Sequence, residues 1–93
     1  MEQRKTGTDT WRVEMWLHPM LREARPARNR VFREVLAVVQ RMPDPLVRSG
    51  DTWSALLDGS TVVIGPLTSM GRCAKVAATF KAIRGLVVRP RRT

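Results

Sequence analysis

The chain has 93 residues and carries 17 Lys and Arg against eight Asp and Glu, which gives a formal net charge of +9 at pH 7. A chain of this length forms one domain, because two halves would each be too small to bury an adequate core. Its one Cys and one His exclude an internal disulfide and a four-ligand zinc site. The 43% hydrophobic content is close to the globular norm, so the charge belongs to a folded body and not to a disordered basic chain.

The apolar runs are short, far below the roughly 20 residues that a membrane span needs. The amino-terminal residues also lack the apolar stretch that secretory signals carry. Both features predict a cytoplasmic protein that does not insert into a membrane.

The first predicted elements are a strand and a helix. Apolar and polar residues alternate over 11–17, which predicts a half-buried strand that ends at Pro19. Residues 20–27 are typical of a loop. Residues 28–42 carry apolar side chains at helical spacing, which predicts an amphipathic helix that stops before Pro43.

A hairpin is predicted next. Residues 52–57 and 61–64 flank Asp58-Gly59, a dipeptide that favours the tight turn between two antiparallel strands.

The last predicted elements are a second helix and a final strand. The helix is expected over 70–84, with Thr68 or Ser69 as its cap and Gly85 at its carboxyl end. The strand is expected over 86–89.

The order strand, helix, strand, strand, helix, strand is the ferredoxin-like β-α-β-β-α-β arrangement. It predicts an α+β fold in which a four-stranded antiparallel sheet carries both helices on one face. This single domain is expected to span 10–89. A flexible amino-terminal arm over 1–9 and a basic carboxyl-terminal tail over 90–93 would flank it.

Candidate catalytic residues are few. His18 ends a strand beside a proline, so we expect it to make only local hydrogen bonds. Cys73 falls on the inward stripe of the second helix, which favours a buried hydrophobic residue over a reactive thiolate. The glycines are isolated and form no phosphate-binding loop. We therefore expect a protein that is not an enzyme and that needs no metal or cofactor.

The basic residues form two groups along the chain. The first surrounds the start of the first helix and comprises Arg22, Arg25, Arg28, Arg30 and Arg33. The second crowds the end of the chain, where Arg84 precedes the candidate binding residues Arg89, Arg91 and Arg92. Arginines at a helix amino terminus add to the positive end of the helix dipole, which favours an anionic partner. The alternative is a solvated basic rim.

Trp16 is the second candidate feature. The alternation over 11–17 places it beside Arg12, Glu14 and His18 on the open face of the sheet, away from the helices. A tryptophan there can stack on a nucleobase or anchor a protein contact. Alternatively, it packs under the amino-terminal arm or against a second copy of the chain.

Two families bear on these residues. RNA-recognition motifs read bases with aromatic residues on both central strands. Trp16 can represent one of them, but residues 61–64 contain none, so the chain departs from that family. The stretch 62–69, followed by an alanine-rich helix and 86–89, resembles the second half of peptidoglycan-binding SPOR domains. That resemblance covers about a third of the chain, which departs from the family in lacking its usual anchor or export signal.

Our first hypothesis is a small, non-enzymatic module that binds DNA or RNA through its arginines. The alternative is a protein encoded by a phage or mobile element that inhibits a host complex, as anti-CRISPR proteins do. Its cations would then dock on an acidic protein or ribonucleoprotein surface. A third possibility is a homodimer through the open sheet face.

Overall fold

The computed structural model describes residues 10–48 and 53–93. The predicted arm over 1–9 and Thr52, at the start of the predicted hairpin, lie outside them. The elements in chain order are β1 (Trp11–Leu17), η1 (Pro19–Leu21), α1 (Arg25–Arg41), α2 (Pro45–Arg48), η2 (Trp53–Asp58), β2 (Val62–Leu67), α3 (Met70–Lys81) and β3 (Leu86–Arg92).

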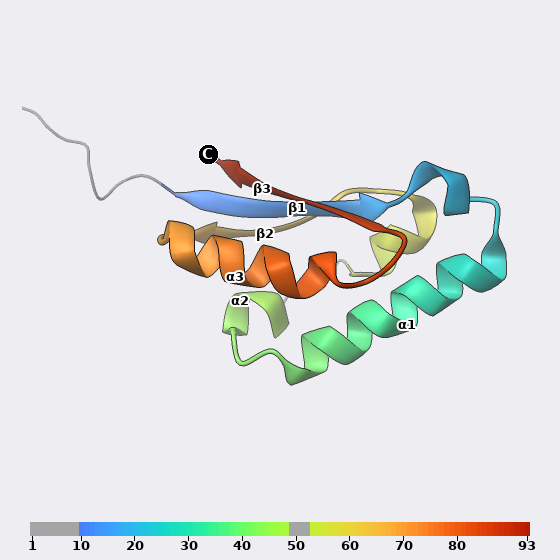
Figure 1. The fold of residues 1–93 in the computed structure, drawn as a ribbon, viewed down its shortest axis with the longest axis horizontal. Helices are drawn as coiled ribbons and strands as arrows, with labels where there is room; N and C mark the ends of the chain where they lie inside the picture. The colour runs from blue at the N-terminus through green and yellow to red at the C-terminus, as the bar shows by residue number, and fades with distance from the viewer. Residues whose placement is uncertain (1–9, 49–52) are drawn as a thin grey trace, which may run out of the picture.

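The three strands form one antiparallel sheet in the order β2-β1-β3. The α-helices all lie on one side of this sheet, and the other side is the open face (Figure 1). Since β2 and β3 both pair with β1, α3 carries the chain from one edge of the sheet to the other. The predicted α+β class is therefore confirmed, but the described residues form three α-helices on this side of the sheet and not the two that were predicted.

The predicted four-stranded, ferredoxin-like sheet is wrong, because residues 53–58 form the 3-10 helix η2. The buried residues of this segment, Trp53 and Leu56, are three apart. That spacing is one turn of a 3-10 helix, whereas the prediction assumed the period of two of a strand. The Trp53 ring stacks on Phe80 of α3 with the ring centroids 5.5 Å apart, so the segment buries its apolar surface against a helix.

The predicted turn is present without its hairpin. Gly59 has the expected positive φ of 80°, but it follows η2 and does not join two strands. Backbone hydrogen bonds from Gly59 N to the Leu56 carbonyl and from Ser60 N to the Ala55 carbonyl close the helix. The positive φ of Gly59 therefore marks the end of a helix and not the turn of a hairpin, since both kinds of turn favour such a residue.

The helix ends differ from the predicted ones by a few residues. Helix α1 begins at Arg25, within the predicted loop. Pro26 is well suited to the first helical turn, because the backbone N–H groups of that turn have no acceptor within the helix and proline lacks this group. Helix α3 begins after Ser69, whose hydroxyl accepts a hydrogen bond from Arg72 N at 3.2 Å, as a cap does. It ends at Lys81, and Gly85 follows with a φ of 96°.

The final strand continues beyond its predicted end. Residues 90–92, expected as part of a basic tail, extend β3 and pair with β1. Pro90 is tolerated because β3 is an outer strand, where one side of the backbone needs no hydrogen-bond donor.

The core lies between the sheet and the helices. β1 contributes Val13, Met15 and Leu17, and Phe80 of α3 has no exposed surface. Cys73 is buried as predicted, and its burial raises the pKa of its thiol. Within the described residues no polar or charged residue is buried, so the charged side chains all reach the surface.

Candidate nucleic-acid interface

The open face of the sheet is built by the residues that alternate with the core. In β1, the buried Val13, Met15 and Leu17 point toward the helices, so the intervening side chains point away from them. These side chains of β1 are Arg12, Glu14 and Trp16. Their partners on β3 are Arg91, Arg89 and Val87, respectively. The strand β2 adds Val63, which lies opposite Glu14.

Two arginines converge on one carboxylate in this face. The Arg12 Nε donates to Glu14 Oε2 at 2.7 Å, and the Arg91 Nε lies 3.3 Å from Glu14 Oε1. The hydrogen bond from Arg12 holds the pKa of Glu14 below its usual value, while partial burial opposes that shift. With 37% and 53% of their side chains exposed, Arg12 and Arg91 can still present guanidinium nitrogens to an anion.

Arg89 adds a third cation. It lies opposite Glu14 in the ladder between β1 and β3 and is exposed. We call Arg12, Arg89 and Arg91 the sheet arginines. Among the described strand residues, this face carries three positive charges and one negative charge, that of Glu14. The face is therefore cationic, and β-ladder hydrogen bonds hold its geometry.

Trp16 lies on the same face, as predicted. It is half-buried and pairs with Val87 across the strands. An indole that is partly packed and partly exposed keeps a defined orientation while it offers aromatic surface to a partner.

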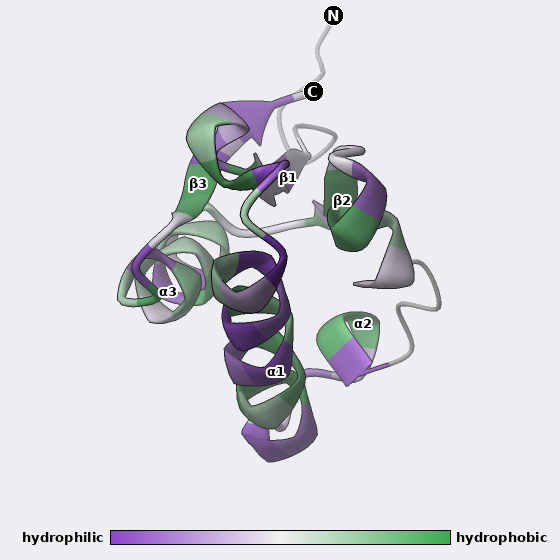
Figure 2. Cartoon of the chain, turned by 90° about the vertical axis from the view of Figure 1, so that its right-hand side faces the viewer, coloured by the Kyte–Doolittle hydropathy of each residue, from purple (hydrophilic) through white to green (hydrophobic). Residues whose placement is uncertain are grey.

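The predicted arginine patch around the start of α1 lies elsewhere. The start of α1 is at the right-hand end of Figure 1, and the carboxyl end of β3 is at the opposite end. Figure 2 looks onto the α1 end, where the first turns of α1 are hydrophilic. The members of this group, called the helix-start arginines below, are Arg22, Arg25, Arg28, Arg30 and Arg33.

Two of the helix-start arginines are engaged in local structure. Arg28 donates through Nη1 to the Arg22 carbonyl at 3.3 Å. Arg30 pairs with Glu34 at 2.6 Å, one helical turn later, and its Nη2 lies 3.5 Å from the Arg84 carbonyl. The fold therefore brings Arg84 to the start of α1, although its sequence position groups it with the end of the chain.

The start of α1 has no side-chain cap. Ala24 occupies the N-cap position, and the first turn contains no acidic residue. Unpaired helix amide groups and nearby arginines make this end electropositive.

Arg92 is separated from the other arginines of β3. It pairs with Trp11, and its guanidinium carbon lies 5.9 Å from the centroid of the Trp11 ring. Because side chains alternate along a strand, Arg92 points to the opposite face from Arg91. Of the predicted carboxyl-terminal group, Arg89 and Arg91 thus belong to the open face, and Arg92 does not.

Arg12 is the residue that the prediction of the site missed. The alternation in 11–17 already placed Arg12 beside Trp16, which was the available signal. His18 behaves as predicted, since its Nδ1 accepts a local hydrogen bond from Met20 N at 3.2 Å.

Among residues 10–48 and 53–93, no group of three or more His, Cys, Asp and Glu is placed to hold a metal ion. No helix in the same residues is both long and apolar enough to cross a membrane. Comparison of the chain with protein-family models, curated proteins and solved structures finds no match. The geometry of the open face is therefore the basis for a functional proposal.

Proposed function

We propose that the chain is a small, non-enzymatic module that binds single-stranded nucleic acid across the open face of its sheet. The observation that supports this is the presence of Trp16 and the sheet arginines on one face. Aromatic side chains stack on unpaired bases, and arginines contact the phosphates that connect them.

The choice of a single strand follows from the aromatic residue. Stacking needs the flat face of a base, which a duplex buries between neighbouring pairs. Trp16 lies in a sheet, and the described α-helices lie on the opposite side of that sheet, where they cannot place a helix from the open face into a major groove (Figure 1). A flexible strand can instead bend to place one base on the indole and its phosphates near the sheet arginines.

A titration of labelled single-stranded and duplex oligonucleotides tests this proposal. We expect single strands to bind more tightly than duplexes of the same sequence at low salt. The logarithm of the affinity should fall with the logarithm of salt with a slope of about −2, from roughly 0.7 per phosphate contact and three arginines. Equal affinity for duplexes, or no binding at low salt, would refute it.

A second measurement separates nucleic acid from protein partners, because a cationic face also attracts acidic proteins. Partners retained from a cell lysate should be lost after nuclease treatment. A complex that survives nuclease favours the inhibitor hypothesis. Light scattering should show a monomer, since a homodimer through this face would cover Trp16.

A further inference from the structure

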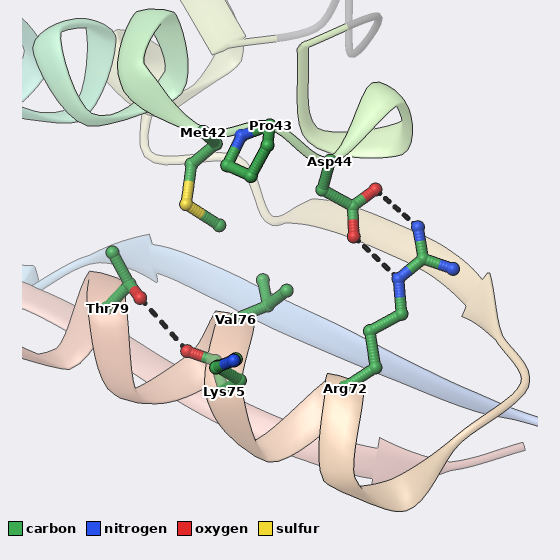
Figure 3. Close-up of a pocket in the computed structure, with 7 residues that line it drawn as sticks. All are labelled: Met42, Pro43, Asp44, Arg72, Lys75, Val76 and Thr79. Carbon is green, nitrogen blue, oxygen red and sulfur yellow. Dashed lines mark hydrogen bonds and ion pairs between the residues drawn. The ribbon is translucent and has the colours of Figure 1, made fainter.

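A groove runs between α1 and α3 in the helical layer. It consists of two hollows of about 300 Å³ and about 360 Å³, and both are lined by Thr79 of α3. Figure 3 shows the first hollow, where Met42 points from the end of α1 toward Val76 and Thr79. Because Thr79 lines both hollows, they are neighbours along α3, and we refer to the two together as the groove.

The walls of the groove are apolar, and several of the side chains that form them are short. Val38 and Met42 line the α1 side, and Val76 lines the α3 side. Ala37 and Ala82 line it too and are exposed, although long polar residues are the usual choice for exposed helix positions. Short side chains here leave room for the side chains of a partner.

An ion pair holds one end of the groove in place. Arg72 Nε and Nη2 each donate to an Asp44 carboxylate oxygen at 2.7 Å (Figure 3). Asp44 Oδ1 also accepts a hydrogen bond from Leu46 N at 2.9 Å. The hydrogen bond from Arg72 lowers the pKa of Asp44, so the carboxylate stays charged at neutral pH. This contact ties the connection between α1 and α2 to α3.

The charges that remain in the groove are positive. Of the ionisable residues that line it, Asp44 and Arg72 neutralise each other, and Glu34 is paired with Arg30 at 2.6 Å. Arg41 on α1 and Lys75 on α3 are exposed and have no carboxylate partner within the described residues. An apolar channel thus has a cation on each wall.

We propose that this groove is a docking site for an acidic amphipathic helix of a partner protein. The apolar face of such a helix would pack between α1 and α3, and its carboxylates would pair with Arg41 and Lys75. The groove follows α3 from Arg72 to Lys81, which corresponds to about 14 Å or two and a half helical turns, and Ala82 and Ile83 continue its lining just beyond the helix end. This interface is separate from the open sheet face and does not depend on its function.

Charge excludes a second copy of the chain as the occupant. Helix α3 contains Arg72, Lys75 and Lys81 and no acidic residue. Helix α1 contains Glu34 as its one acidic residue, and Arg30 neutralises it. Either helix of another copy would place cations against Arg41 and Lys75.

Selection from a displayed library of random peptides of about 12 residues, the length that spans the groove, tests the proposal on the whole chain. We expect the selected peptides to be rich in Asp and Glu and to carry apolar residues at i, i+3, i+4 and i+7. A single-stranded oligonucleotide should not displace them, which separates this site from the open face.

Three variants locate the binding. Lys75→Glu should lower the affinity of a selected peptide about tenfold by replacing attraction with repulsion. Lys81→Glu makes the same charge change on α3 outside the groove lining and should leave the affinity unchanged. Thr79→Trp fills the junction of the two hollows and should abolish binding, with circular dichroism showing that the variant is folded.

The proposal is overturned by selected peptides without an acidic excess, by the absence of any selected binder, or by equal loss in Lys75→Glu and Lys81→Glu. If Thr79→Trp does not fold, the comparison of the two lysine variants decides the question.

Discussion

The sheet arginines and the helix-start arginines contain the same side chain in two different settings. On the open face, Arg12 and Arg91 converge on Glu14, and the strand ladder fixes their spacing. At the start of α1, Arg28 and Arg30 contact backbone carbonyls and serve local structure. The arginines that share a sheet face with an aromatic residue are thus the three sheet arginines and not the five helix-start arginines, which form the larger group in the sequence. Density of charge along a chain does not by itself produce convergence in space.

The strongest test of this contrast compares two double variants with the same loss of charge. Arg89→Gln with Arg91→Gln should weaken the binding of a single-stranded oligonucleotide about thirtyfold, from roughly 1 kcal/mol for each arginine–phosphate contact. Arg25→Gln with Arg33→Gln should weaken it less than about threefold, through the long-range field alone. Fluorescence anisotropy at fixed salt measures both. Equal losses would mean that net charge, and not the open face, determines affinity.

The aromatic residue gives the next largest effect. Trp16→Ala should lower affinity for single strands about tenfold, because stacking on one base contributes roughly 1–3 kcal/mol. Val63→Ala removes an exposed apolar residue of the same face and is the matched control. Binding that is insensitive to Trp16 in the anisotropy titration would leave the face as a purely electrostatic surface.

The start of α1 offers a gain of stability. Ala24→Asp supplies the missing cap and a negative charge at the positive end of the helix, so it should stabilise the fold by about 1 kcal/mol and raise Tm by several degrees. Ala24→Val offers no acceptor and should give no such gain. Calorimetry measures Tm, and oligonucleotide affinity should stay unchanged. An unchanged Tm in the aspartate variant would show that the missing side-chain cap does not limit the stability of the fold.

The smallest expected effect concerns Glu14. Because Arg12 lowers the pKa of Glu14 in the folded chain, their interaction stabilises the fold above the ordinary value of 4.5 and is lost as pH falls below it. Glu14→Gln should therefore lower Tm slightly at pH 7, and its difference from the parent chain should vanish in acid. Glu23→Gln, at an exposed position, is the control. A difference that persists at low pH would point to lost packing, not to charge.

Patterning in the sequence predicted the elements whose apolar period was long and regular. The alternation over 11–17 correctly placed Trp16 on the open face. The apolar stripe of α1 correctly predicted that Val31 and Val35 are buried. Residues 53–58 were wrongly predicted as a strand, because an apolar run that short is compatible with periods of both two and three. Trp53 of this segment packs against Phe80, a residue far away in the sequence, and the local pattern does not reveal that contact.

The sequence predicted only part of the candidate site, because it shows which residues are neighbours within a strand but not which strands pair. Neighbours along a strand are visible in the sequence, so Trp16 and Arg12 could be grouped. Pairing between strands is not visible there, and it is this pairing that brings Arg91 to Glu14 and separates Arg84 from Arg89.

Each outer strand of the sheet contains a proline, Pro66 in β2 and Pro90 in β3, and the central strand contains none. An exposed sheet edge is a template on which other chains can add strands and aggregate. Proline removes a donor from that template, and the arginines beside Pro90 repel a second basic chain. Both outer strands therefore lack one of the backbone donors that an added strand would use, which disfavours growth of the sheet by backbone pairing.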